Sequence, residues 1–289
     1  MEIYPALAAN IIASVQLALA EDIGSGDITA QLIPADKQSS ATIITRENAV
    51  VCGIAWVNEV FHQLDPSLKV VWSVKDGDAI SVNQVLCTLQ GNARALLTGE
   101  RAALNFLQTL SGTATTSRHY ASLMANAGGN GQKIRVLDTR KTLPGLRLAQ
   151  KYAVKVGGCD NHRIGLYDAF LIKENHIAAC GGIAKAVAQA RIIAPQKPVE
   201  VEVESLGEYQ QALDAGADRI MLDNFSTEDI QQARQISQTH DKSSAVELEV
   251  SGNIAADNIG QYQSLDIDFV STGALTKHCQ AVDYSMRIQ

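Results

Sequence analysis

Short apolar runs alternate with helical segments through the second half of the chain. In each helical segment the apolar residues recur three and four positions apart. Six or seven strand–helix units within about 150 residues predict a parallel sheet closed into a barrel, or an open relative of one. A doubly wound sheet is the alternative, and it is weakened because no GxGxxG motif follows the first run. The predicted strands span 134–138, 168–175, 198–205, 218–224, 245–252 and 268–275, and the predicted helices span 145–158, 182–194, 207–216, 227–238 and 255–265.

The first part of the chain does not repeat one unit. Its opening segment is an apolar run broken by Asn10, Ser14 and Gln16, with no basic residues before it. This pattern predicts an amphipathic helix that packs on the fold, and it argues against a signal peptide or a membrane span. Further along, strand-like runs mixed with helical segments predict a small α+β domain. The strand-like runs span 39–48, 50–56, 68–80 and 85–91, and the helical segments span 56–64 and 93–124, with Gly112 as a possible interruption.

Composition narrows the class of protein. The 289 residues are 46% hydrophobic and 19% charged, which is ordinary for a globular protein with a real core. A net charge of −7 with no basic tail argues against nucleic-acid and membrane binding. The cysteines are odd in number and never in CxxC spacing, which indicates reduced thiols in a cytoplasmic protein.

Polar residues end or follow all six predicted strands. The carboxyl ends of barrel strands face the mouth where active sites form, so the coincidence across six strands predicts an enzyme. In strand order, the residues are Asp138 and Arg140; Lys173 and Asn175; Glu202 and Glu204; Asp223 and Asn224; Ser251, Gly252 and Asn253; and Ser271, Thr272 and Gly273.

Basic residues gather between positions 134 and 177, against the negative charge of the whole chain. Each one taken singly is equally well explained as a solvated surface charge. Together they predict several positive groups at one mouth and hence an anionic ligand. Arginine binds carboxylates and phosphates in bidentate fashion, and lysine supplies a mobile point charge. The candidates are Arg140, Lys141, His162, Arg163 and Lys173.

Acidic residues on the third predicted strand supply the opposite charge. Glu200, Glu202 and Glu204 alternate with valines, so all three point to one face of the strand. If that face is the barrel interior, at least the last of them reaches the mouth, where it needs a metal or a cationic partner. Asp223 offers a second carboxylate near the same rim, and such a pair beside a basic pocket suits Mg²⁺ carrying a polyphosphate. The alternative is that the glutamates face helices or solvent.

The ends of the last two predicted strands favour phosphate binding. Gly252 and Gly273 lie there with hydroxyl side chains nearby. Barrels commonly build a phosphate site at this place from backbone N–H groups, although ordinary turns use the same residues.

Long stretches of the sequence resemble the quinolinate phosphoribosyltransferases, also called nicotinate-nucleotide pyrophosphorylases (carboxylating). The stretches are LDTRKTLPGLR, KYAVKVGGCDNHRIGLYDAFLIKENHI, VEVEVES, MLDNF, LEVSGNI and DFVSTGALT, with EDIGSGDIT and LTGERAALNFLQTLSGTAT earlier in the chain. They cover nearly the whole chain in the family's order. The resemblance implies transfer of phosphoribosyl from 5-phosphoribosyl 1-pyrophosphate to quinolinate, with Mg²⁺ and with decarboxylation. The products would be nicotinate mononucleotide, pyrophosphate and CO₂, in NAD biosynthesis.

The resemblance also implies roles for single residues. The quinolinate pocket would be formed by Arg140, His162, Arg163 and Lys173, with Lys141 at its border with the phosphoribosyl substrate. Glu202 and Asp223 would face the ribose and Mg²⁺, with the metal held mostly through pyrophosphate and water. The 5′-phosphate would be bound by Ser251, Gly252, Asn253 and Gly273. Catalytic roles would belong to Lys141, Lys173, Glu202 and Asp223.

The fold and assembly implied by the resemblance are equally specific. We expect an α/β protein with an N-terminal α+β sandwich domain at residues 1–112 and a catalytic open, incomplete α/β barrel with parallel strands at residues 113–273. A tail at residues 274–289 would return to the first domain. Arg101 would be donated to the site by a neighbouring subunit, in a homodimer or a hexamer.

Three other interpretations remain open from the residues alone. A phosphoribosyltransferase of the same fold could act on another heteroaromatic acid. A Schiff-base aldolase would also place a lysine, here Lys173, at the end of a barrel strand, but it needs fewer flanking cations. Residues 69–91 resemble a lipoyl carrier module, although Lys75 precedes the DG turn and no lysine occupies the hairpin tip.

Overall fold

The polypeptide folds into two structural units that exchange segments along the chain. The computed structural model describes residues 3–125, 133–240 and 246–288. Its first unit contains Met1–His119, Thr142–Gly158 and Leu275–Gln289, and its second contains Tyr120–Lys141 and Cys159–Ala274. The segment 142–158, which the sequence pattern assigns to the barrel, therefore belongs to the first unit.

The first unit is built on an antiparallel sheet with the strand order β12-β1-β5-β3. These strands are β1 (Gln38–Thr45), β3 (Lys69–Trp72), β5 (Val85–Asn92) and β12 (Tyr284–Ile288). A separate pair is formed by β2 (Ala49–Val50) and β4 (Ala79–Ile80). The last strand of the chain, β12, lies antiparallel to β1, so the tail is an integral part of this sheet.

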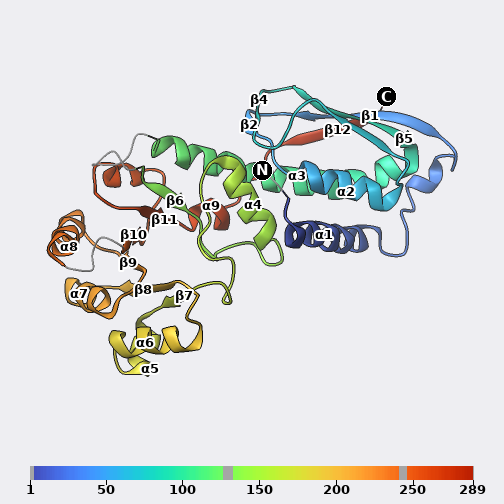
Figure 1. Ribbon diagram of the computed structural model, residues 1–289. Helices are drawn as coiled ribbons and strands as arrows, with labels where there is room; N and C mark the ends of the chain where they lie inside the picture. The colour runs from blue at the N-terminus through green and yellow to red at the C-terminus, as the bar shows by residue number, and fades with distance from the viewer. Residues whose placement is uncertain (1–2, 126–132, 241–245, 289) are drawn as a thin grey trace. The chain divides into compact units, whose positions relative to one another are not determined.

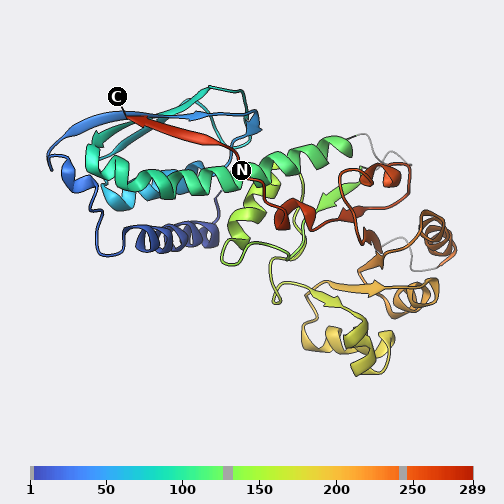
Figure 2. The ribbon, with the colours of Figure 1, turned by 180° about the vertical axis from the view of Figure 1, so that it is seen from behind.

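Helices cover one face of this sheet. The helices of this unit are α1 (Pro5–Ile23), α2 (Ile54–Leu64), α3 (Ala93–Leu123) and α4 (Arg147–Gly157), with a short 3₁₀ helix, η1 (Ala30–Leu32). Figures 1 and 2 show α2 and α3 directly below the sheet and α1 below them. Within the described residues, α1 is long and apolar enough to cross a membrane. It buries Leu7, Ile11, Val15 and Leu19 along one side, as expected for an amphipathic helix packed on the fold.

Two details of the first unit differ from the sequence pattern. The strand predicted at residues 50–56 forms only at Val50, the end of β2, because the chain turns at Gly53, whose φ is +118°, and helix α2 begins at Ile54. Helix α3 runs without interruption through Gly112. A Cβ at Gly112 would lie 2.0 Å from the carbonyl oxygen of Gln280, so glycine is required there for close packing of the C-terminal segment and not for a break in the helix.

The second unit contains a six-stranded parallel sheet in the order β6-β11-β10-β9-β8-β7. This order is the cyclic order of a barrel that is open between its first and second strands, so the predicted open parallel barrel is confirmed. The strands are β6 (Arg135–Leu137), β7 (Phe170–Ile172), β8 (Val199–Val203), β9 (Arg219–Asp223), β10 (Glu247–Ser251) and β11 (Phe269–Ser271).

Helices lie on the outer side of this sheet (Figure 1). They are α5 (Glu174–Cys180), α6 (Ile183–Ile193), α7 (Leu206–Ala215) and α8 (Thr227–Thr239), and the short α9 (Ala274–Lys277) follows the last strand. The helix predicted at residues 255–265 is wrong, because only a 3₁₀ turn, η3 (Ile259–Tyr262), forms there. Asn258 explains part of this difference, since its side chain bonds the backbone of Ala255 and Asn253 and competes with a regular helix.

Candidate active site

A pocket of about 320 Å³ opens in the second unit where the parallel strands end. Side chains from all six strands or the segments that follow them reach it, which is the arrangement expected at the carboxyl ends of a barrel. The lining residues are Thr139, Arg140, Lys141, His162, Arg163, Leu171, Lys173, Glu202, Met221, Ser251 and Ser271. Its volume is in the range of small-molecule sites.

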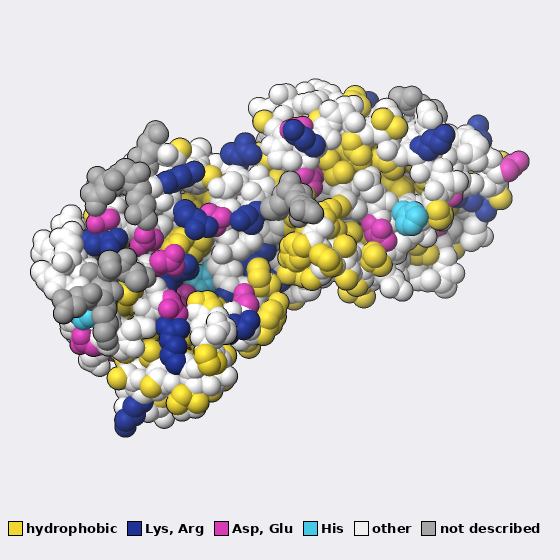
Figure 3. Space-filling model, in the orientation of Figure 1, with side chains coloured by type: hydrophobic (Ala, Val, Ile, Leu, Met, Phe, Trp, Pro, Cys, Tyr) yellow, Lys and Arg dark blue, Asp and Glu magenta, His cyan; other side chains and the backbone are white. Residues whose placement is uncertain are grey.

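Positive charge dominates the pocket. Arg140 and Arg163 line the same pocket, and burial together with the neighbouring charge of Arg140 lowers the pKa of Arg163. The Arg163 guanidinium is held by the carbonyl oxygen of Ala169 at 3.3 Å. Crowded cations of this kind are stabilised by an anionic ligand. Figure 3 shows basic and acidic side chains intermixed on the visible face of the second unit, at the left of the view.

One carboxylate faces the cations inside the pocket. Lys173, at the end of β7, forms an ion pair with Glu202 of β8. Glu202 is mostly buried, with 11% of its side chain exposed, whereas 41% of the Lys173 side chain is exposed. Glu202 therefore faces the barrel interior, and the prediction that the glutamates of this strand point inward is confirmed for Glu200 and Glu202.

Asp138 anchors the segment that carries two pocket residues. Its buried carboxylate accepts the backbone N–H of His162 at 2.9 Å and the side-chain amide of Asn161 at 2.7 Å. Asp160, which precedes Asn161, forms an isolated parallel β-bridge with Leu137 at the edge of β6. These bonds place His162 and Arg163 next to the end of β6 on the open side of the barrel.

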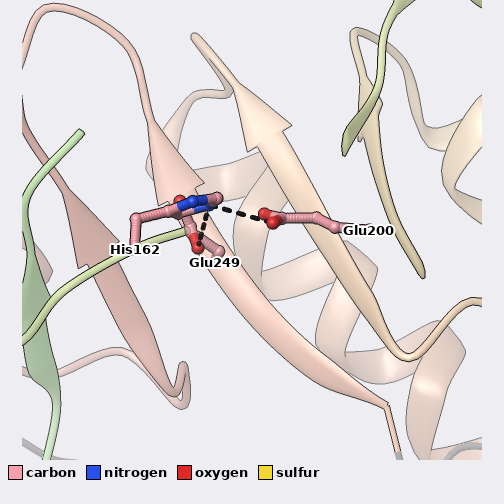
Figure 4. Close-up of side chains that lie close together, drawn as sticks. All are labelled: His162, Glu200 and Glu249. Carbon is pink, nitrogen blue, oxygen red and sulfur yellow. Dashed lines mark ion pairs between the residues drawn. The ribbon is translucent and has the colours of Figure 1, made fainter. Parts of the chain in front are cut away.

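Two further carboxylates lie beneath the pocket. His162 Nε2 is 2.9 Å from Glu200 Oε2 and 3.5 Å from Glu249 Oε2, as Figure 4 shows. Burial raises the pKa of Glu200 to about 7, and burial together with the charge of Glu200 raises the pKa of Glu249 to about 7. The two carboxyls therefore cannot both be ionised without cost near neutral pH.

An arginine balances these carboxylates from the barrel floor. Arg219 of β9 contacts Glu249 at 3.2 Å and Glu247 at 2.7 Å. Its guanidinium also lies 4.0 Å from the centre of the Phe269 ring, and Arg135 lies over the same ring at 5.2 Å. The barrel interior thus holds a charged and aromatic network in place of the usual aliphatic layers.

The loops after β9 and β10 are bound tightly to each other. Asn224 and Asn253 adopt positive φ angles of 56° and 48°, and the Asn253 amide donates to Asn224 Oδ1 at 3.2 Å. Gly252, with φ of +108°, has space for no side chain, since a Cβ would lie 2.3 Å from Asn224 Oδ1. Left-handed non-glycine residues cost free energy and cluster at ligand-binding loops.

Most of the predicted site residues come together in this pocket. Those that line it are Arg140, Lys141, His162, Arg163, Lys173, Glu202 and Ser251. Four others occupy the adjacent strand ends outside the lining, namely Asp223, Gly252, Asn253 and Gly273. Arg101 is exposed on α3 in the first unit and does not line this pocket.

Sequence reasoning missed several residues of the site. Thr139, Leu171 and Met221 line the pocket, and Glu249 lies beneath it. Glu249 alternates with Ser251 along β10, just as Glu200 alternates with Glu202 along β8. That alternation was the one signal in the sequence for an inward-facing Glu249.

Two groups of acidic residues are candidates for binding a metal. Within the described residues, His162, Glu200 and Glu249 form a buried group whose ligand atoms all lie within 4.8 Å of one another. Arg219 already occupies one side of Glu249, so a cation is poorly suited to that place. Glu202 and Asp223, at the ends of β8 and β9, are partly exposed and carry the carboxylate oxygens that Mg²⁺ prefers.

The fold and the pocket together define a two-domain α/β-barrel enzyme with a site for an anionic small molecule. Comparison with known families makes the class specific. The chain belongs to the quinolinate phosphoribosyltransferase family: the family's N-terminal domain matches residues 27–111, and its C-terminal domain matches residues 113–287. The resemblance seen in the sequence motifs is thereby confirmed.

Named relatives agree over nearly the full length of the chain. The solved structure of the nicotinate-nucleotide pyrophosphorylase from Francisella tularensis matches with a TM-score of 0.91 and 48% identity, covering 98% of this chain and 97% of that one. A probable nicotinate-nucleotide pyrophosphorylase (carboxylating) of Bacillus subtilis is 38% identical, covering 93% of this chain and 90% of the relative. Quinolinate phosphoribosyltransferase (decarboxylating) 1b of Nicotiana tabacum is 37% identical, covering 95% and 81%.

Proposed function

We propose that this protein transfers phosphoribosyl from 5-phosphoribosyl 1-pyrophosphate to quinolinate and removes one carboxylate as CO₂. The products are nicotinate mononucleotide and pyrophosphate, which places the reaction in NAD biosynthesis. Family membership supports the proposal, and so do the names of the relatives. The observation that carries it is the gathering of Arg140, Lys141, Arg163 and Lys173 in one pocket, because quinolinate brings two carboxylates and the second substrate brings phosphates.

The cationic side of the pocket binds quinolinate. Arg140 and Arg163 present guanidinium groups that suit the two adjacent carboxylates of the pyridine ring. Neutralising both carboxylates lets the ring approach a second, highly anionic substrate. Lys141 lies between the two binding regions and reaches the phosphoribosyl substrate, while Lys173 holds the position of Glu202 through their ion pair.

The opposite rim binds the phosphoribosyl substrate. Its 5′-phosphate is bound by backbone N–H groups and hydroxyls of the tight loops at Ser251, Gly252, Asn253 and Gly273. Glu202 and Asp223 face the ribose, where a carboxylate stabilises the positive charge that develops as pyrophosphate leaves. Glu202 and Asp223 are also the residues that would hold Mg²⁺, mostly through water and pyrophosphate. When bound, the ion neutralises the charge of the leaving group.

The order of the two chemical steps follows from charge. The ring nitrogen of quinolinate attacks the anomeric carbon of the ribose, and the bond to pyrophosphate breaks. The ring nitrogen then carries a positive charge, which stabilises the electron pair left on the neighbouring carbon when CO₂ departs. A proton then joins that carbon. Ribosylation therefore precedes decarboxylation, and the residues of the pocket mainly orient two anions that repel each other.

A second copy of the chain completes the site in this proposal. Arg101 is exposed on α3, near a groove of about 430 Å³ that α1 and α3 border in the first unit. Leu17 in the lining of this groove is 71% exposed, and Ile12 on the same helix is 52% exposed. Exposed apolar side chains beside a groove suit a subunit interface. We place the protein in the cytoplasm as a homodimer or a hexamer, with Arg101 reaching the pocket of the neighbouring subunit.

The reaction balance tests the proposal. Quinolinate labelled in the carboxyl next to the ring nitrogen is incubated with the protein, 5-phosphoribosyl 1-pyrophosphate and Mg²⁺. We expect labelled CO₂, pyrophosphate and nicotinate mononucleotide in equal amounts. In Arg163→Ala the KM for quinolinate should rise at least about tenfold, because a charged hydrogen-bonding partner is lost. The matched control, Lys185→Ala, removes an exposed cation of α6 and should leave turnover unchanged. The absence of product from quinolinate would overturn the assignment.

The competing interpretations predict different results. A transferase for another heteroaromatic acid would leave quinolinate unused and accept a different ring acid in the same assay. An aldolase would be trapped by borohydride with a carbonyl substrate. The ion pair of Lys173 with Glu202 argues against the aldolase, because Glu202 engages the nitrogen that would have to attack a carbonyl substrate.

A further inference from the structure

Three side chains form a closed cluster under the pocket floor. Glu200 comes from β8 and Glu249 from β10, two strands separated by β9 in the sheet. Both carboxylates point into the barrel, with 7% and 0% of their side chains exposed. His162 Nε2 points at both of them, as Figure 4 shows. Glu200 and Glu249 do not line the pocket, whereas His162 does.

The hydrogen bonds of His162 define its tautomer. The backbone N–H of Arg163 donates to His162 Nδ1 at 2.8 Å, so Nδ1 carries a lone pair. The ring proton is then on Nε2, which faces Glu200 and Glu249. The Arg163 N–H thus engages Nδ1, whereas Nε2 is buried within ion-pair distance of both carboxylates without an aligned hydrogen bond. A ligand in the pocket meets the carbon edge or the face of the imidazole and not an N–H donor.

The surrounding charges keep Glu249 in place. Arg219 donates from β9 to Glu249 Oε2 at 3.2 Å, the same oxygen that His162 Nε2 approaches. The other charged groups that act on Glu200 are Arg163 and Glu202, and Glu247 acts on Arg219. Burying two neighbouring carboxylates costs free energy, and apolar side chains would fill a barrel interior at lower cost. Glu200 and Glu249 are therefore better explained by a role in the pocket above them than by a contribution to the stability of the fold.

We propose that Glu249, with Glu200, is a positioning residue: the two carboxylates hold the His162 ring through their close contacts with Nε2 and thereby fix the floor against which the heteroaromatic acid packs. The inference rests on the proposed function for the identity of that acid. In this proposal the His162 ring forms a surface for packing of the acid and does not supply a positive charge to it. Fixing the imidazole also fixes Arg163, because the Arg163 backbone is bonded to the same ring.

Two variants at position 249, one that changes the charge of the side chain and one that changes its length, distinguish a positioning role from a purely electrostatic role. Glu249→Gln keeps the length and one acceptor oxygen for Nε2–H but removes the negative charge. Glu249→Asp keeps the charge but withdraws the oxygens by one carbon. We expect Glu249→Asp to raise the KM for quinolinate about tenfold while kcat and the KM for 5-phosphoribosyl 1-pyrophosphate stay within about twofold, and Glu249→Gln to stay near wild type.

The histidine spectrum gives a readout that does not depend on turnover. Nitrogen-15 NMR of the histidine-labelled protein should show His162 as the neutral Nε2–H tautomer in the wild type and in Glu249→Gln, and as a mixture in Glu249→Asp. Glu247→Gln is the matched control, since Glu247 is exposed on the same strand and contacts Arg219 but not His162. It should change neither the spectrum nor the KM.

Two outcomes would overturn the inference. The first is a Glu249→Asp protein with the wild-type KM for quinolinate and the wild-type tautomer. The second is a defect in Glu249→Gln that Glu249→Asp lacks, because charge and not reach would then matter. If the wild type itself does not use quinolinate, the proposed function fails, and the tautomer measurement alone still decides whether the carboxylates hold His162.

Discussion

Asp138 holds His162 by its backbone: the buried carboxylate accepts the His162 N–H at 2.9 Å, immediately after the first barrel strand ends. The barrel is open at this edge, so no neighbouring strand β7 pairs with β6. Asp138 and the bridge from Leu137 to Asp160 replace that pairing. The position of the two pocket residues His162 and Arg163 thus depends on the Asp138 side chain and on this bridge, both outside the pocket.

Removing this anchor should weaken quinolinate binding selectively. In Asp138→Ala two hydrogen bonds to a carboxylate are lost, and we expect the KM for quinolinate to rise about tenfold and the free energy of unfolding to fall by about 2 kcal/mol. Asp138→Asn keeps an acceptor for the His162 N–H. Its KM for quinolinate and its free energy of unfolding should therefore lie between those of the wild type and of Asp138→Ala. Steady-state kinetics and chemical denaturation measure both effects. A folded Asp138→Ala enzyme with unchanged KM would show that the loop is held by other means.

The loop at Gly252 should tolerate no side chain. A Cβ there would lie 2.3 Å from Asn224 Oδ1, and the φ of +108° is unfavourable for any other residue. We expect Gly252→Ala to raise the KM for 5-phosphoribosyl 1-pyrophosphate at least about tenfold and to lower stability by about 1–3 kcal/mol. Gly260→Ala is the matched control, because a Cβ at Gly260 meets no atom within 4 Å. If Gly252→Ala and Gly260→Ala had the same KM for 5-phosphoribosyl 1-pyrophosphate and the same stability, the loop at Gly252 would not be a phosphate-binding loop that requires glycine.

The buried carboxyl of Glu249 should make stability depend on pH. Its pKa is about 7 in the folded protein against an ordinary value of 4.5, so the folded state keeps a proton that the unfolded state releases. Stability is therefore full below pH 4.5 and decreases as the pH rises toward 7. Glu249→Gln has no proton to release, and its free energy of unfolding relative to wild type should increase by on the order of 2 kcal/mol across this range. Glu247→Gln, at an exposed site, should keep the wild-type slope.

Two inactive variants should restore activity when mixed, if Arg101 serves a neighbouring subunit. Arg101→Ala lacks the donated arginine, and Lys173→Ala lacks a residue of the pocket that receives it. After subunit exchange about one quarter of all sites in a mixed dimer population would contain both native residues. We expect activity near that level from the mixture and almost none from either variant alone. No recovery after verified exchange would indicate that each Arg101 acts within its own chain or not at all.

Local patterns in the sequence were sufficient for the strands of the barrel and for much of the cationic pocket. The apolar runs end at Asp138, Lys173 and Asp223, and parallel strands necessarily bring such ends to one edge. The alternation of Glu200 and Glu202 with valines likewise predicted their inward direction, because the period of a strand is two residues.

Other features depend on contacts between distant segments and could not be predicted locally. The meeting of His162, Glu200 and Glu249 requires the curvature of the sheet across β8, β9 and β10. Gly112 suggested a helix break, whereas its real partner is Gln280, far along the chain. At residues 255–265 apolar spacing predicted a helix, but the side-chain bonds of Asn258 favour a turn.

The central claim is that the crowded cations around Arg140 and Arg163 select a ring acid with two carboxylates. The most direct test compares kcat/KM for quinolinate and for nicotinate, which lacks the carboxylate next to the ring nitrogen, with 5-phosphoribosyl 1-pyrophosphate and Mg²⁺ at saturation. Because a site built for a charged group rejects a ligand without it, we expect quinolinate to be preferred at least about 100-fold. Equal use of both acids, or a preference for nicotinate, would contradict the account.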